Sequence, residues 1–276
     1  MQVGEVSSGG SSHRGAGASG TVSEDRRVTV FSANGRLYQV EYAWNATRLA
    51  GVTSVGVRGA DSVCVVGQRR ASEPKDKLLD MTSVSRLFPI TERLGLLATG
   101  IVGEGRALAH EARNQTAEFR FKWGYEMPPD VLAQWIADRA QIWTQYGSKR
   151  PSGVVAMILG IDDEKETPQL FTCDPAGYFF GHKAASAGQR DREADNFLEK
   201  KMKNNPSLSF QETIETAISA LQFALKEDLK ATEIEVGAVR TDDPTFRVLT
   251  EAEIDEHLKA NNPGKAELKA TQFLSY

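Results

Sequence analysis

The sequence predicts an α+β fold in which two antiparallel sheets are stacked and helices cover their outer faces, a four-layer α/β/β/α sandwich. The predicted elements alternate in blocks: strands, two helices, strands, two helices and strands again. That order favours antiparallel sheets with helices packed outside them over a doubly wound parallel sheet. The chain of 276 residues is long enough for one large domain or two small ones.

The N-terminal part combines a polar tail with a predicted helix. Residues 1–23 are rich in Gly and Ser and have almost nothing to bury, so we expect a disordered tail. After a turn at Asn34-Gly35, apolar residues recur at helical spacing, and Gly51 suits the end of that helix. The apolar stripe consists of Leu37, Val40, Ala43, Trp44 and Thr47. A helix with one apolar face ahead of the core docks either on its own domain or on another protein.

The remaining elements follow in the order that the block pattern requires. Short β-branched runs separated by small turns predict strands, and longer runs with helical apolar spacing predict helices. Thr250 and Glu253 form a predicted capping box for the last helix. The predicted strands are 53–58, 62–68, 86–90, 94–101, 154–161, 169–173, 177–181, 183–187, 235–239 and 246–249. The predicted helices are 104–122, 130–146, 191–202, 209–225 and 250–259, and residues 261–276 are expected to form a flexible C-terminal tail.

The composition excludes several classes of function. A formal net charge of −4 argues against nucleic acid as the main partner, because phosphate binding needs clustered basic surface. Cys64 and Cys173 lie among apolar neighbours and are expected to be reduced, buried thiols of an intracellular protein. No apolar run reaches the roughly 18 residues of a membrane span, and the start lacks the layout of a signal peptide. We therefore expect a soluble protein of the cytosol or nucleus.

No metal or cofactor site is predicted. The histidines share no ligand spacing, and the run His110-Glu111-Ala112-Arg113-Asn114 lacks the second histidine of a zinc-protease helix. The glycine-containing run at 99–105 fits neither nucleotide-binding pattern, and Glu104 would repel phosphate.

The stretch Phe31–Ala43, F-S-A-N-G-R-L-Y-Q-V-E-Y-A, resembles the N-terminal signature of α-type subunits of the eukaryotic 20S proteasome core particle. The resemblance covers nearly all of residues 23–259 and includes C-D-P-A-G at 173–177. The run Leu249–Asp255 looks most like the type-six α subunit, which takes the first position of the α ring. The resemblance implies the N-terminal-nucleophile hydrolase fold, which is an α/β/β/α sandwich. It implies one domain over residues 24–260, in which 24–51 form the signature and an extra N-terminal helix.

The resemblance also implies a function. In this family α subunits form a heptameric ring that caps the catalytic β rings, and their N-terminal segments converge over the axial pore. The expected partners are other α subunits, β-ring subunits and the C-terminal tails of regulatory particles or activators, with no nucleic acid, membrane or cofactor. The resemblance therefore implies a non-catalytic structural and gating subunit for ubiquitin-dependent and ubiquitin-independent protein degradation, in cytoplasm and nucleus.

The alternative is an active threonine hydrolase produced by removal of residues 1–52. Active β subunits of the family use a threonine at a free N-terminus, whose amine serves as base for its own hydroxyl. Aligned on the first hairpin, that threonine falls at Val52, and the supporting aspartate and lysine fall at Gln68 and Arg86. Gln carries no negative charge, and Arg does not give up a proton near neutral pH. No catalytic residue is therefore expected in this chain.

Gate residues are carried over from the family by position. The gate region comprises Glu24, Asp25, Arg26, Ala33 and Tyr42. The chain departs from the family pattern at Glu24, where an aromatic is frequent, and at Ala33, where a proline is frequent. Asp25 and Tyr42 are both present, so the Tyr42 hydroxyl can still donate a hydrogen bond to the Asp25 carboxylate.

Two docking surfaces also follow from the resemblance. Regulator tails insert between α subunits, where a lysine commonly meets their carboxylate; here that position holds Arg86, with Gly51 at the neighbouring backbone position. An arginine can pair with a carboxylate through two hydrogen bonds. Leu37, Val40 and Trp44 are expected to contact both the chain's own sandwich and the adjacent subunit.

Overall fold

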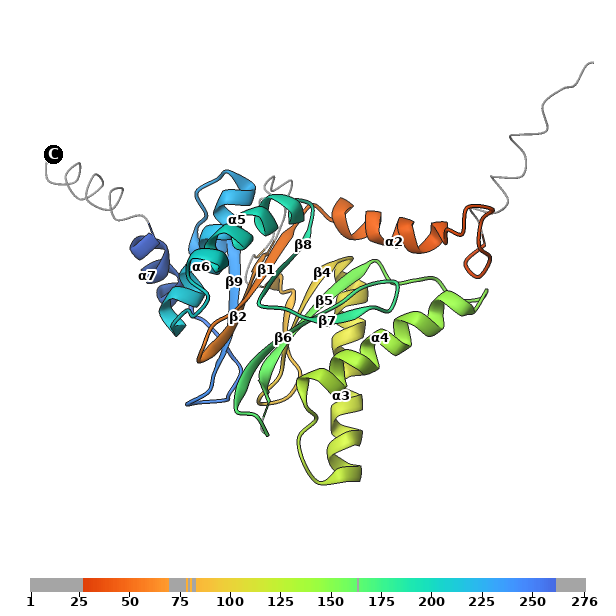
Figure 1. The fold of residues 1–276 in the computed structure, drawn as a ribbon, viewed down its shortest axis with the longest axis horizontal. Coiled ribbons are helices and arrows are strands. Elements are labelled where there is room, and N and C mark those ends of the chain that lie inside the picture. The colour runs from red at the N-terminus through yellow and green to blue at the C-terminus, as the bar shows by residue number, and fades with distance from the viewer. Residues whose placement is uncertain (1–26, 70–77, 79, 81–82, 163, 262–276) are drawn as a thin grey trace, which may run out of the picture.

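A computed structural model of the chain describes residues 27–69, 78, 80, 83–162 and 164–261 (Figure 1). The predicted tail at 1–23 and all but the first residue of the predicted tail at 261–276 lie outside the described residues. The helix α7 ends at Asn261, two residues beyond the predicted end, so it includes the first residue assigned to the C-terminal tail.

Two antiparallel five-stranded sheets form the centre of the molecule. The first has the order β10-β9-β2-β1-β8, and the second has the order β3-β4-β5-β6-β7. The first sheet contains β1 Thr53–Arg58, β2 Ser62–Gln68, β8 Ala184–Gly188, β9 Ile234–Arg240 and β10 Arg247–Val248. The second contains β3 Leu87–Pro89, β4 Gly95–Gly100, β5 Val154–Asp162, β6 Thr167–Cys173 and β7 Phe179–Gly181. Every pairing between neighbouring strands is antiparallel, as the block order predicts.

Helices cover the outer face of each sheet (Figure 1). On the first sheet α6 packs against β1 and β2, with α5 and α7 beside it, and on the second α3 and α4 pack against β4, β5 and β6. The bounds are α3 Val102–Trp123, α4 Pro129–Gln145, α5 Asp191–Asn204, α6 Phe210–Leu225 and α7 Glu251–Asn261. The predicted α/β/β/α sandwich is confirmed.

The core has three parts because the sandwich has three interfaces between layers. One apolar cluster fills the space between the sheets, a second lies under α5, α6 and α7, and a third lies under α3 and α4. A strand between a helix layer and the other sheet is covered on both faces, so its sequence is continuously apolar. In Val154–Asp162 every residue is buried, and all of them before Asp162 are apolar or glycine.

The helix α2, Tyr38–Leu49, lies outside these layers, along one end of the sandwich (Figure 1). It contacts β4 and β5 of one sheet and β8 of the other. Gly51 follows it with a φ of +72°, the left-handed conformation expected where this helix ends.

Some element boundaries differ from the prediction for local reasons. The strand expected from Gly177 begins at Phe179, because the Asp174 carboxylate accepts hydrogen bonds from the N–H groups of Ala176 and Tyr178 and holds a turn there. Gly177 has a φ of +91°, and a Cβ at that position would lie 2.5 Å from the Cβ of Gln141 on α4. Close packing of this turn on the helix therefore requires glycine.

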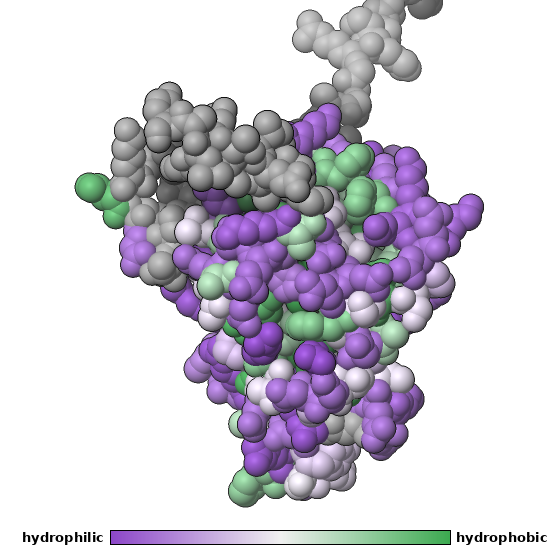
Figure 2. All heavy atoms as spheres, turned by 90° about the vertical axis from the view of Figure 1, so that its left-hand side faces the viewer, coloured by the Kyte–Doolittle hydropathy of each residue, from purple (hydrophilic) through white to green (hydrophobic). Residues whose placement is uncertain are grey.

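The surface view of the side that carries α7 is mainly hydrophilic, with apolar residues scattered between the polar ones (Figure 2). Such scattering is ordinary for a folded surface. Among the described helices, none is long and apolar enough to cross a bilayer. The described residues also contain no group of three or more His, Cys, Asp or Glu side chains placed to hold a metal ion.

Candidate functional site

The apolar stripe of α2 packs on the chain's own sandwich. Val40, Ala43 and Thr47 are buried, and the Thr47 hydroxyl donates a hydrogen bond to the Ala43 carbonyl oxygen at 3.2 Å. Trp44 is partly buried and packs against the apolar cluster between the sheets. Leu37 is also partly buried. Docking on its own domain therefore accounts for most of the stripe, and contact of this helix with an adjacent subunit stays a prediction.

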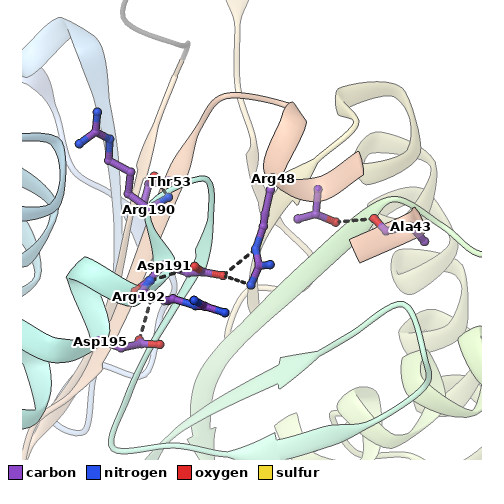
Figure 3. Close-up of polar contacts among 9 residues, drawn as sticks. Ala43, Arg48, Thr53, Arg190, Asp191, Arg192 and Asp195 are labelled. Atoms are coloured by element: carbon purple, nitrogen blue, oxygen red, sulfur yellow. Dashed lines mark hydrogen bonds and ion pairs between the residues drawn. The ribbon is translucent and has the colours of Figure 1, made fainter. Parts of the chain in front are cut away.

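Hydrogen bonds tie the end of α2 and the first residues after it to the segment that joins β8 to α5, and Figure 3 shows those from Arg48 to Asp191. The Arg48 guanidinium donates to Asp191 Oδ2 from Nη2 at 3.0 Å and from Nε at 3.2 Å. The Arg190 N–H donates to Thr53 Oγ1 at 3.2 Å, and the Gln189 N–H donates to the Val52 carbonyl oxygen at 3.0 Å. The position of α2 is thus coupled to the N-terminal end of α5.

A buried polar cluster lies where β1 leaves this junction. The Thr53 N–H donates to Gln68 Oε1 at 2.8 Å, and both residues are buried. Next to them, the Thr99 hydroxyl donates to Ser54 Oγ at 2.8 Å. The nitrogen of Thr53 is part of a peptide bond and donates its hydrogen, so it has no lone pair with which to act as a base.

Arg86 is a buried cation with an incomplete set of partners. The residue is only 7% exposed. Its Nη1 donates a hydrogen bond to the Gly100 carbonyl oxygen at 2.8 Å, whereas Nε has no partner. Its backbone N–H donates to Glu235 Oε1 at 2.9 Å. Burial lowers the pKa of Arg86, and the nearby charge of Glu235 opposes that change. Gly51 donates its own N–H to the Arg48 carbonyl oxygen, and no hydrogen bond within the described ranges joins Gly51 to Arg86.

The structure describes two of the five predicted gate residues. Ala33 is exposed in a turn closed by a hydrogen bond from the Gly35 N–H to the Ser32 carbonyl oxygen at 2.8 Å. Tyr42 is 44% exposed on α2. Its ring stacks on that of Tyr38, with centroids 6.3 Å apart. The positions 24, 25 and 26 lie outside the described residues, so the hydrogen bond between Tyr42 and Asp25 stays a prediction.

Sequence reasoning missed the ion pair of Arg48 with Asp191 and a second acidic site at Glu104. The Glu104 carboxylate pairs with Arg150 and accepts hydrogen bonds from Ser152 Oγ at 3.0 Å and the Gly153 N–H at 2.8 Å. Burial alone would raise the pKa of Glu104, but these bonds outweigh it and lower that pKa. The position of Arg48 in the last turn of α2 was a weak signal for its ion pair with Asp191. No local pattern indicated the ion pair of Glu104 with Arg150.

Comparisons with known proteins identify the relatives of this chain. A family model described as "Proteasome subunit" matches residues 49–239, and a second model, for the N-terminal signature of A-type proteasome subunits, matches residues 25–46. The "Probable proteasome subunit alpha type-1" of Schizosaccharomyces pombe is 47% identical, over 86% of this chain and 95% of the relative. The "Proteasome subunit alpha type-6" of Caenorhabditis elegans is 37% identical, over 85% and 94%. The "Proteasome subunit alpha" of Saccharolobus solfataricus is 35% identical, over 85% and 95%.

Proposed function

This chain belongs to the proteasome α-subunit family, and we propose that within it the chain is a non-catalytic subunit whose N-terminal segment gates the particle. Relatives 35–47% identical over most of the chain support a structural role in the outer ring. The relatives carry different type numbers, so the type-six assignment stays a prediction.

The observation that carries the non-catalytic role is the set of residues at the positions of the hydrolase machinery, beginning with Val52 at the place of the nucleophilic threonine. A nucleophile of the N-terminal threonine kind needs a free amine beside the hydroxyl. Here the nitrogen of Thr53 is a buried amide bonded to Gln68, and its hydroxyl accepts from the Arg190 N–H. The neutral amide of Gln68 and the cation of Arg86 stand where the active subunits have an acid and a lysine. These features favour the scaffold over the hydrolase.

The gating role is supported by the placement of α2. This helix lies at one end of the sandwich, and residues 27–37, which precede it, lie at the outer end of the helix (Figure 1). The Gly/Ser-rich composition of residues 1–23 predicts a segment with little free-energy cost for moving. A tail of this kind, held by α2 at its base, is suited to block or clear a pore.

We also propose the partners and places that go with this role. The chain joins other α subunits in a heptameric ring, contacts the β ring, and accepts regulator tails in the cleft marked by Gly51 and Arg86. The Nε–H group of Arg86 has no acceptor and can donate a hydrogen bond to a carboxylate. Because the side chain is nearly buried, docking requires the cleft to open around it. The particle that contains the chain works in the cytoplasm and nucleus.

The test of gating is deletion of residues 2–23 in the otherwise complete particle. We expect peptide hydrolysis by the latent particle to rise several-fold, because the pore loses part of its barrier. Deletion of residues 262–276 is the matched control, and it should leave the rate unchanged. Equal rates for the two deletions and the full-length chain would show that this tail is not part of the gate.

A further inference from the structure

A groove of about 560 Å³ lies between α2, α5 and the edge strands β7 and β8. The strands β7 and β8 are the edges of the two sheets, so the groove opens where both sheets end. Its inner wall is apolar and includes Val155, Ala185 and Leu198, while Trp44 of α2 closes one side. A groove of this size is within the range of roughly 300–1,000 Å³ that holds ligands.

Two aromatic rings stand at the mouth of the groove. Tyr178 is 62% exposed and Phe180 is 60% exposed. Their rings stack nearly parallel, with centroids 6.1 Å apart. Aromatic side chains are enriched at protein interfaces, and their faces attract cations. The turn before β7 and the strand β7 itself therefore present an aromatic surface to a partner.

The facing side of the groove carries acidic residues. Asp191, Asp195 and Glu199 follow one another at four-residue intervals on α5, so they share one face of the helix, and Figure 3 shows the first two. Arg48 neutralises the first, and the other two, which line the groove, make no ion pair within the described part of the chain. The Asp195 carboxylate accepts a hydrogen bond from the Ser186 hydroxyl at 2.6 Å. Like charges one turn apart repel each other, so a cation placed between Asp195 and Glu199 is favoured.

The other ionisable groups leave the groove negative. Asp174 is held by the turn that precedes Tyr178. Burial lowers the pKa of His182, whose Nε2 lies 2.8 Å from the Thr172 hydroxyl, so the imidazole is neutral near pH 7. Lys183 is the one cationic side chain among the described lining residues. Three carboxylates therefore face a single ammonium group.

We propose that this groove receives an arginine side chain from the adjacent α-type subunit of the ring. A guanidinium group stacks on an aromatic face and binds a carboxylate through two hydrogen bonds, so one arginine satisfies both walls of the groove. In a ring, the contact joins two different surfaces of neighbouring subunits, so the groove of one chain meets another face of the next. The inference rests on the proposed membership of the ring.

Photo-cross-linking in the assembled particle tests the location of this contact. Tyr178 is replaced by p-benzoylphenylalanine, and the matched control carries the same group in place of Phe121, which is 94% exposed on α3. We expect the first variant to cross-link to a neighbouring α-type chain beside an arginine, and the control not to reach that segment. A cross-link to a β subunit, to a regulator or to a second copy of this chain would overturn the proposal, and so would the absence of any cross-link.

Charge reversal tests the chemistry of the contact. In cells that also make the untagged wild-type chain, tagged Glu199→Lys should enter the particle about tenfold less than the tagged wild type, since like charges at an interface are strongly disfavoured. Glu193→Lys is the control, because it is exposed on the same helix and does not line the groove. Equal incorporation of Glu199→Lys would overturn the arginine contact alone. Failure of the tagged wild-type chain to enter any α ring would overturn the proposed function as well.

Discussion

At the start of β1 the amide nitrogen of Thr53 is buried and needs an acceptor inside the sandwich. As a free amine it would be a base, but as a buried amide it is only a donor, and Gln68 supplies the acceptor. Arg86 is also buried, and burial lowers its pKa while the charge of Glu235 opposes that change. Gln68 and Arg86 are thus both bonded inside the sandwich, Gln68 to the Thr53 N–H and Arg86 to the Gly100 carbonyl oxygen.

Removal of the Gln68 side chain is expected to cost about 1–3 kcal/mol of unfolding free energy, because the Thr53 N–H is then left buried without an acceptor. Denaturant unfolding of Gln68→Ala measures this cost. Gln211→Ala, at an exposed position of α6, is the control and should change stability by less than about 0.5 kcal/mol. Similar values for both variants would show that the buried bond contributes nothing.

The pH dependence of the unfolding free energy should reveal the contribution of the Glu104 carboxylate. Its folded-state pKa lies below its ordinary value of 4.5, so its stabilising contribution is present above about pH 4.5 and is lost as the pH falls through the folded-state pKa. Glu104→Gln should therefore destabilise the chain at pH 7, and the difference from wild type should shrink below pH 4.5. Unfolding midpoints measured from pH 3 to pH 7 check this. Glu118→Gln, exposed on the same helix, should show no such convergence.

At the scale of the element, α2 differs from every other helix in the described ranges. It covers the ends of both sheets rather than a sheet face, and its last turn is bound to the β8–α5 turn. Its first turn has no side-chain cap, since Leu37 stands at the N-cap position. We therefore expect α2 to open first from its N-terminal end, which is also the end nearest the proposed gate.

The ion pair of Arg48 with Asp191 should couple α2 to α5 by about 0.2–1 kcal/mol, the range of partly exposed pairs. A double-mutant cycle with Arg48→Ala and Asp191→Asn measures the coupling in denaturant unfolding. Hydrogen exchange of the amides in α2 should also quicken in both single variants. The exposed pair of Arg247 and Glu253 is the control, because its loss should leave exchange in α2 unchanged. A coupling energy of zero would mean that the pair does not hold the helix.

At the scale of the whole molecule, the order of elements was predictable and the contacts between distant residues were not. Strands 53–58 and 62–68 have the predicted bounds, because β-branched residues and a Gly-containing turn are local signals. The start of β7 was predicted wrongly, since the Asp174 side chain competes for the backbone there. The resemblance aligned Gln68 with the supporting aspartate of the active subunits. The hydrogen bond of its side chain with the Thr53 N–H became visible only in the fold. Arg48 and Asp191 are 143 residues apart in sequence, and only the three-dimensional structure pairs them.

The last prediction concerns the integrity of the chain in the particle. Cleavage after Val52 would remove α2 with its buried Val40, Ala43 and Thr47, and would place a charged amine where the Thr53 amide is buried. Intact mass of the chain from purified particles should therefore include the residues before Thr53. Peptide hydrolysis per particle should be unchanged by Thr53→Val, whereas alanine at the N-terminal threonine of an active β subunit should reduce it. A mass lacking residues 1–52, or loss of hydrolysis in Thr53→Val, would make this chain a hydrolase.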